Sequence, residues 1–209
     1  MIFKKTPVLL ANGTFPKHKF PLNILKKSNN IICLDGAVNM LVEKKITPSL
    51  ILGDLDSILS KYRKKFSDII IEMPDQKEND LRKALKWLDE KKCPSVFILG
   101  ATGLREDHAI ANIFSILETD FKIKIKIITD YGIFQIIREK EKVNSFKGQP
   151  VSLFTSNKQT KITTSRLKYN LNKSELKHLY SGSLNESLSS NFIIKTEKGP
   201  VLLYLAHSK

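Results

Sequence analysis

The sequence predicts an α/β fold, with a doubly wound, mostly parallel sheet domain followed by a small all-β sandwich domain. Up to about residue 130, short continuous apolar runs alternate with segments of helical periodicity. The remaining residues show strand patterns without long helices. With 209 residues, 41% of them hydrophobic, the chain is long enough for one sizeable core plus a smaller unit. We expect domains at residues 1–137 and 138–209, with a boundary near Arg138.

Six apolar runs predict the strands of the first domain. They lie at residues 7–12, 30–36, 49–54, 68–73, 95–101 and 124–129. Between them, apolar periodicity predicts helices at residues 38–45, 78–90 and 107–118. In the second helix Leu81, Ala84, Leu85 and Leu88 recur at the spacing of one buried face. Because the strands are apolar throughout, helices must cover both faces of a mostly parallel sheet.

The second domain is predicted from strands at residues 132–139, 150–156, 161–171 and 191–206. The last run contains Lys198-Gly199-Pro200, which favours a hairpin turn between two strands. Residues 173–179 are the one segment here expected to form a helical turn.

The composition excludes several classes of protein. No apolar run approaches the 18 residues of a membrane span, and the start of the chain is too briefly apolar for a signal peptide. Cys33 and Cys93 lack the spacing of a zinc or redox pair. We therefore expect a soluble, cytoplasmic protein without a membrane partner, in which both cysteines pack in the interior.

The net charge of +14 is spread along the chain rather than concentrated in one block. Residues 1–130 carry 22 basic and 16 acidic residues, net +6, and residues 131–209 carry 13 and 5, net +8. This pattern is typical of a solvated surface. The alternative is that the excess positive charge assists the binding of an anion. All ten aspartates lie at or before Asp130, so carboxylate chemistry is expected from the first domain.

Polar residues follow the predicted strands at their carboxyl ends, where ligands bind in open parallel sheets. Asp54 and Asp56 follow the third strand, and residues two apart in extended backbone point to the same side. Mg²⁺ prefers one or two such carboxylates together with phosphate oxygens and water. The alternative is that these aspartates only form a turn or cap a helix. Asp35 and Asp80, expected near neighbouring strand ends, favour the metal site.

The loop after the fifth strand has the features of a phosphate cradle. Gly100 and Gly103 permit close approach of backbone to an anion, Arg105 offers a fork of donors, and a helix begins directly afterwards. The loop lacks the GK[ST] of a Walker motif, and a simple tight turn is the alternative. His108 fits a hydrogen-bonded structural residue in the first turn of that helix, and Asn112 faces the same way.

Taken together, these stretches resemble the thiamin pyrophosphokinase family, in order along nearly the whole chain. The family patterns DGGAN, GDxDS, DQxxTDxxKAL and GATGGRxDHxxANI match residues 35–39, 53–57, 75–85 and 100–113. The second domain is similar to the family's β-sandwich, whose GLKYPL and SNE elements correspond to residues 166–171 and 184–186.

The resemblance implies transfer of the pyrophosphoryl group of ATP to the hydroxyl of thiamin, with release of AMP and use of Mg²⁺. It implies an ATP- and metal-binding first domain in which Asp54, Asp56 and Asp80 are the catalytic and metal-holding carboxylates. It implies a homodimer whose thiamin site is shared between subunits, with substrate contacts from Gln76, Asn185 and Glu186. The residues implied for the nucleotide and phosphates are Asp35, Gly36, Asn39, Gly100, Gly103, Arg105, Asp107, His108 and Asn112.

Four positions depart from the family patterns. Ala37 and Leu104 replace glycines, Asn79 replaces a threonine, and Leu184 stands where a serine is usual. The acceptor is consequently less well defined than the metal and phosphate roles, and a thiamin analogue or precursor is an alternative acceptor.

Two other functions are alternatives. A DxD phosphatase would use Asp54 as a nucleophile, but its motif normally occupies the first strand and here follows the third. A basic nucleic-acid-binding protein without catalysis would fit the net charge, but no recognisable RNA or DNA module is present.

Overall fold

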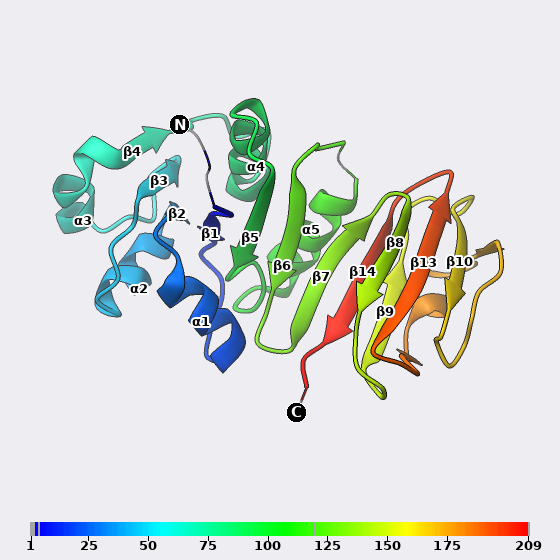
Figure 1. The fold of residues 1–209 in the computed structure, drawn as a ribbon. Helices are drawn as coiled ribbons and strands as arrows, with labels where there is room; N and C mark the ends of the chain where they lie inside the picture. Colours follow the sequence, from blue (N-terminus) through cyan, green and yellow to red (C-terminus); the bar gives the residue numbers. More distant parts are fainter. Residues whose placement is uncertain (1–2, 4, 119, 209) are drawn as a thin grey trace. The chain divides into compact units, whose positions relative to one another are not determined.

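The structure, a computed structural model, describes residues 3, 5–118 and 120–208, and its chain divides into two compact units, residues 1–130 and 131–209 (Figure 1). An α/β unit is followed by an all-β unit, which confirms the fold class predicted from the sequence. No helix among the described residues is long and apolar enough to cross a membrane.

The first unit alternates strands and helices along the chain. Its elements are β1 (Val8–Leu10), α1 (Lys19–Lys27), β2 (Ile31–Leu34), α2 (Ala37–Glu43), β3 (Leu50–Gly53), α3 (Ser60–Lys65), η1 (Ser67–Ile69), β4 (Ile70–Glu72), α4 (Asp80–Glu90), β5 (Ser95–Leu99), α5 (Glu106–Leu117) and β6 (Lys124–Ile128). The six predicted strands are present, and each is shorter than its apolar run.

These strands form a parallel sheet in the order β6-β5-β1-β2-β3-β4. The chain steps outward from β1 to β4 and then returns to place β5 on the other side of β1. Because parallel crossovers are right-handed, the helices made before and after this reversal cover opposite faces of the sheet. The sheet is therefore doubly wound, and its reversal point between β1 and β5 is where ligands bind in such folds.

Two helices of this unit lacked a clear sequence signal. In α1, Pro21 lies in the first turn, where the missing N–H leaves no hydrogen bond unmade, and the His18 ring accepts from Phe20 N at 3.3 Å. The short α3 has no buried residue, so it carries no apolar periodicity.

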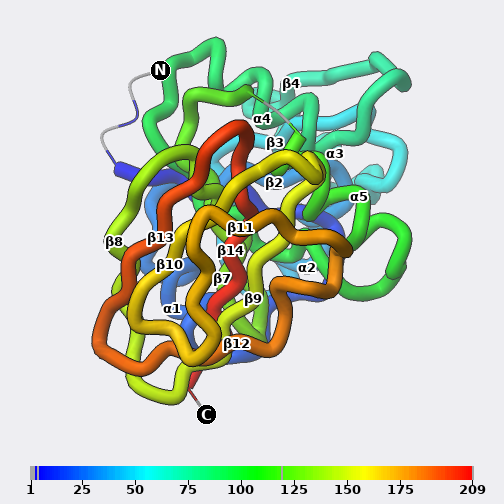
Figure 2. The backbone as a smooth tube through the Cα atoms, turned by 90° about the vertical axis from the view of Figure 1, so that its right-hand side faces the viewer, coloured from blue at the N-terminus to red at the C-terminus, as the bar shows by residue number. Residues whose placement is uncertain are grey.

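The second unit consists of two four-stranded antiparallel sheets, ordered β12-β9-β14-β7 and β11-β10-β13-β8. Its elements are β7 (Gly132–Ile137), β8 (Lys140–Asn144), β9 (Pro150–Phe154), β10 (Lys161–Ser165), β11 (Ser174–Glu175), η2 (Leu179–Gly182), β12 (Asn185–Glu186), β13 (Asn191–Glu197) and β14 (Val201–Ala206). Figure 2 shows the backbone of these strands from a second side. Residues from both sheets, including Leu153, Phe192 and Leu203, form one buried core, so the unit is a sandwich.

Three sequence expectations about the second unit are corrected. Residues 131–137 belong to it rather than to the first domain, because β7 pairs with β14 along its whole length. Lys198-Gly199-Pro200 does not close a hairpin: β13 pairs with β10 and β8, whereas β14 pairs with β7 and β9, so this connection passes between the two sheets. The helical turn expected at residues 173–179 is misplaced: Ser174–Glu175 pairs with β10 as a short edge strand, and the 3₁₀ helix η2 begins only at Leu179.

Candidate active site

A cavity of about 730 Å³ opens at the carboxyl ends of the first unit's strands. Residues that follow five different strands line it: Asn12 and Gly13 follow β1, Asp35 follows β2, Asp54, Asp56 and Ser57 follow β3, Gln76–Leu81 follow β4, and Ala101 and Gly103–Arg105 follow β5. Further along the helices, Lys83, His108 and Asn112 complete the wall. The sheet thus brings together polar residues that lie up to a hundred positions apart.

Asp35, Asp54 and Asp56 form the acidic centre of this cavity. One carboxylate oxygen of each lies within 4.8 Å of the others. The cluster is built by local geometry: Asp35 is 6% exposed and has a left-handed backbone, φ 43°, while its N–H still donates to Leu52 O at 2.8 Å. Leu55, between the other two aspartates, has φ 69° and is buried. The chain therefore turns its apolar residue inward and both carboxylates outward.

Hydrogen bonds fix the orientation of each carboxylate. Gln76 Nε2 donates to Asp54 Oδ2 at 3.0 Å, and Ser57 Oγ donates to Asp56 Oδ1 at 2.8 Å. Ser57 N donates to Asp35 Oδ1 at 3.3 Å. Ser57 therefore links two of the three acidic groups, which the sequence alone did not indicate.

The pKa values of two carboxylates in the cluster are shifted in opposite directions. Burial raises the pKa of Asp35, as does the neighbouring charge of Asp56, while hydrogen bonds from Ser57 and Gly36 oppose the shift. The hydrogen bond from Gln76 lowers the pKa of Asp54, and the charge of Lys83 adds to that effect. Carboxylates this close repel each other unless a cation lies between them, so the arrangement suits a divalent ion.

Asp80 lines the same cavity but lies outside the three-carboxylate cluster among the described residues. It begins helix α4, where its charge complements the helix dipole. Lys83 Nζ lies 2.6 Å from Asp80 Oδ1 and also donates to Met73 O at 3.0 Å. The buried Lys83 is a cavity residue that sequence reasoning missed. Its position three residues after Asp80 on a predicted helix could have indicated an ion pair between the two side chains.

The loops after β1 and β5 are held together by backbone hydrogen bonds. Gly13 N donates to Gly100 O at 2.8 Å, and Thr14 N donates to Thr102 O at 2.9 Å. Gly103 has φ 80°, and a Cβ there would collide with the Thr14 hydroxyl. A Cβ on Gly13 would collide with the backbone oxygen of Gly100. The close contact between the two loops therefore requires both Gly13 and Gly103, and Gly13 is a second residue that sequence reasoning missed.

The start of α5 carries an exposed ion pair. Arg105 Nη2 lies 2.6 Å from Asp107 Oδ2, and Arg105 Nε donates to Asp107 Oδ1 at 3.1 Å. This pairing lowers the pKa of Asp107 to about 2. Arg105 and His108 line the cavity, whereas Asp107 does not and instead orients the guanidinium.

Two asparagines of the expected nucleotide group hold loops in place. Asn39 Nδ2 donates to Ser57 O at 2.9 Å and its Oδ1 accepts from Leu59 N at 3.2 Å, although Asn39 does not line the cavity. Asn112 lines it, donates to Ala101 O at 2.9 Å and accepts from Asn79 Nδ2 at 3.3 Å. Gly36 and Gly100 also lie outside the cavity wall, and Gly36 is the N-cap residue of α2.

In the second unit the Asn185 side chain serves the backbone. Its Nδ2 donates to Tyr169 O at 2.7 Å, and its Oδ1 accepts from Tyr169 N at 3.1 Å and Glu186 N at 2.8 Å. Asn185 is buried, so it positions the loop that carries Tyr169. Direct substrate contact by Asn185 and Glu186 stays a prediction.

Comparisons with known proteins decide the family. The family profile described as "Thiamin pyrophosphokinase, catalytic domain" matches residues 22–129, and "Thiamin pyrophosphokinase, substrate-binding domain" matches residues 132–204. The chain belongs to the thiamin pyrophosphokinase family. Membership makes it an enzyme of the pyrophosphotransferase class.

Relatives and solved structures agree with this family. Thiamine pyrophosphokinase 2 of Oryza sativa subsp. japonica is 25% identical over 93% of this chain and 81% of its own length. Thiamine pyrophosphokinase of Bacillus subtilis is 32% identical over 59% of each chain. The solved structures of thiamine pyrophosphokinase from Bacillus subtilis and thiamin pyrophosphokinase from Candida albicans superpose with TM-scores of 0.77 and 0.78 at 22% and 16% identity. They cover 98% and 97% of this chain, and this chain covers 100% and 90% of theirs, which shows the same fold.

The structure accommodates the departures from the thiamin pyrophosphokinase patterns. Leu104 has φ 62° and is 76% exposed, so its side chain extends into solvent while the backbone keeps a conformation that favours glycine. Ala37 is the first residue of α2, where alanine is suited to the helix. Leu184 has φ 59° and is 89% exposed. No departure removes a carboxylate from the cluster.

Asn79, which stands where the family pattern has a threonine, caps helix α4. Its Oδ1 accepts from Arg82 N at 2.9 Å as the N-cap of α4. We expect Asn79→Ala to lower the free energy of unfolding by about 1 kcal/mol, because the cap is lost, and Asn79→Thr to lower it much less. Urea denaturation of both variants measures this difference. Equal losses in the two variants would contradict the capping role.

Proposed function

We propose that this chain transfers the pyrophosphoryl group of ATP to the hydroxyl of thiamin, giving thiamin diphosphate and AMP. The observation that carries the proposal is the cluster of Asp35, Asp54 and Asp56 within 4.8 Å, in a cavity walled by the glycine loop after β5. Acidic groups beside an anion-binding loop suit a phosphate chain that arrives with a divalent cation.

We propose Mg²⁺ as the metal. Its fit rests on the donors present, since three carboxylates offer the hard oxygen ligands it prefers. Asp54 and Asp56 would hold it together with the buried Asp35. Asp80 is proposed as a further acidic group of the wall, with its charge already balanced by Lys83. When bound, Mg²⁺ neutralises phosphate charge and favours attack on the phosphoryl group.

The chain's own residues then position the substrates. The backbone of Gly103 and the N-terminal turn of α5 present N–H groups to the phosphates, and Arg105 adds donors from the cavity wall. Gln76 keeps the Asp54 carboxylate oriented and ionised through their 3.0 Å hydrogen bond. Phosphoryl transfer depends mostly on such positioning and on charge neutralisation.

We propose further that the enzyme is a cytoplasmic homodimer whose thiamin site is shared between subunits. The support is the group of exposed apolar residues around Asn185, since Tyr169 is 61%, Tyr180 72% and Leu184 89% exposed. Exposed aromatic and aliphatic groups are typical of surfaces that a partner covers. The two free cysteines, both buried, are consistent with a reducing compartment.

Substitution of Leu184 tests the homodimer. We expect Leu184→Asp to weaken self-association, because a charge would be buried in the interface, and to raise the KM for thiamin. Sedimentation velocity measures the association, with a change at another exposed position of the same unit, Lys158→Asp, as the control. A monomeric wild-type protein, or a Leu184→Asp dimer as stable as the wild type, would contradict this assembly.

Product analysis tests the activity. Protein, ATP, Mg²⁺ and thiamin are incubated together, and the products are separated by chromatography. The proposal expects AMP and thiamin diphosphate in equal amounts, with no product when thiamin or Mg²⁺ is omitted. ADP with thiamin monophosphate, or inorganic phosphate released without thiamin, would overturn it, and the second outcome would favour a phosphatase.

A further inference from the structure

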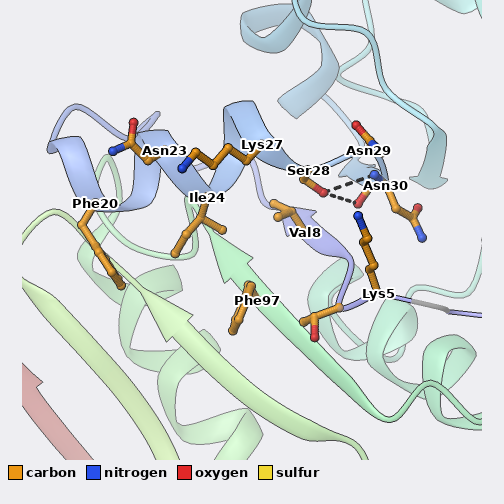
Figure 3. Close-up of a pocket in the computed structure, with 11 residues that line it drawn as sticks. Lys5, Val8, Phe20, Asn23, Ile24, Lys27, Ser28, Asn29, Asn30 and Phe97 are labelled. Carbon is orange, nitrogen blue, oxygen red and sulfur yellow. Dashed lines mark hydrogen bonds between the residues drawn. The ribbon is translucent and has the colours of Figure 1, made fainter.

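A second cavity, of about 350 Å³, lies at the opposite edge of the same unit. Figure 3 shows it between helix α1 and strands β1 and β5. It involves Thr6, which precedes β1, and Asn30, which precedes β2, so it lies at the amino ends of the strands. Its lining shares no residue with the carboxyl-end cavity. The reaction proposed above gives this cavity no role.

The floor of this cavity is apolar. Val8 pairs with Phe97 in the β1–β5 register, so the two side chains lie side by side on one face of the sheet. Ile24 points from α1 toward these two side chains, and Phe20 lies in the first turn of the helix (Figure 3). Phe20 is 41% exposed and Phe97 is half-buried, so α1 leaves part of this apolar surface accessible to water. Covering it with a ligand would be favourable.

The rim of the cavity is basic. Lys5 and Lys27 line it, and the lining contains no aspartate or glutamate among the described residues. Strand β6 extends this charge: Lys126 pairs with Phe97 and therefore lies on the cavity side, while its neighbours Ile125 and Ile127 are buried on the opposite side. The alternation of lysine and isoleucine along β6 therefore places the charge of Lys126 on the same side of the sheet as the apolar floor.

One lining residue, Asn30, has a buried side-chain acceptor without a donor. Asn30 Oδ1 is buried and accepts no hydrogen bond from the described residues, although the Asn30 backbone is bonded to Ser28 and Val8. A buried polar atom of this kind costs free energy unless a ligand or water supplies a donor. Because this oxygen is itself buried, a ligand in the cavity does not reach it, and the apolar floor and the basic rim are the contacts that the cavity offers.

We propose that this cavity binds a small amphipathic anion, with an aromatic or aliphatic body over Val8, Ile24 and Phe97 and a carboxylate or phosphate group near Lys5 and Lys27. Small-ligand sites combine an apolar lining with a few polar groups in this way. A polyanion such as nucleic acid fits less well, because the lysines surround a concave apolar floor rather than an open basic surface.

The probe 8-anilinonaphthalene-1-sulfonate tests this site, because it combines aromatic rings with one negative charge. We expect one bound probe per chain by fluorescence titration and calorimetry. The double change Lys5→Gln with Lys27→Gln should weaken binding about tenfold, since two attractive charges are lost. The matched control is Lys19→Gln with Lys26→Gln, which removes the same charge from exposed positions of α1 outside the cavity and should bind the probe normally.

Three further results decide the inference. Ile24→Trp, which fills the cavity, should reduce binding without unfolding the protein, as circular dichroism checks. Mg²⁺–ATP should not displace the probe, and the uncharged N-phenyl-1-naphthylamine should bind more weakly. Absence of binding, equal affinity in both lysine double variants, displacement by ATP, or equally tight binding of the uncharged compound would each overturn the proposal. None of these outcomes depends on pyrophosphotransferase activity.

Discussion

Asp54→Asn and Asp56→Asn will each lower kcat for thiamin diphosphate formation by about 100-fold or more, as expected when charge stabilisation of a transition state is removed. Each change removes a negative charge from the cluster with almost no change in volume. Asp54 is held by Gln76 and Asp56 by Ser57, so the asparagine side chains will stay in place while metal affinity falls. Kinetics at saturating Mg²⁺, with calorimetric titration of Mn²⁺, measure both effects.

The matched control for these variants is Asp68→Asn. Asp68 lies in η1, outside the cavity wall, and its substitution removes the same charge from the same unit. Asp68→Asn should retain normal turnover and metal binding. Near-normal turnover in Asp54→Asn or Asp56→Asn would contradict the assignment of the metal to this pair.

Gly13→Ala will lose most activity and will destabilise the protein by about 1–3 kcal/mol, as overpacking of a close contact does. A Cβ at Gly13 would collide with Gly100 O and lie 2.7 Å from Thr102 O. Both neighbours are backbone, so the loops after β1 and β5 must separate. Urea denaturation and the KM for ATP measure the two consequences.

Gly148→Ala separates this collision from ordinary glycine effects. Gly148 has φ 87° and nothing lies within 4 Å of its would-be Cβ, so alanine there strains the backbone without displacing a neighbour. It should lower stability modestly and leave the KM for ATP unchanged. A Gly13→Ala enzyme with normal KM and stability would show that contact between the two loops is unnecessary.

The fold of the first unit was predictable because its central strands β1, β2 and β3 are apolar and buried on both faces. Runs such as residues 49–54 and 95–101 allow few structures other than buried parallel strands. Helices that contribute little to the core escaped this reasoning: α3 has no buried residue. In the second unit, edge strand β8 was missed because four of its five residues are exposed, which leaves no apolar alternation.

The location of the acidic centre, at the carboxyl ends of the strands, was predictable. Which aspartates form it was not. Asp54 and Asp56 were expected together, whereas Asp35 joins them because its φ of 43° turns its side chain back toward β3. Asp80 was expected in the cluster and instead lies beside Lys83, a partner on its own helix. Backbone conformation and side-chain pairing decide both cases, and neither is encoded in residue spacing.

The hairpin expected at Lys198-Gly199-Pro200 shows a different limit. A turn signal specifies that the chain reverses, but it does not specify whether the two strands join one sheet or two opposed sheets. Here the apolar faces of β13 and β14 face each other across the sandwich core, with Phe192 and Leu203 both buried.

The fate of the phosphorus atoms of ATP distinguishes pyrophosphoryl transfer from the alternative reactions. ATP carrying distinct labels at the β and γ positions is incubated with protein, Mg²⁺ and thiamin, and both labels are followed into products and protein. If the pyrophosphoryl group is transferred whole, both labels move together into thiamin diphosphate and AMP is left unlabelled. Transfer of the γ label alone, or a labelled aspartyl-phosphate at Asp54, would contradict it.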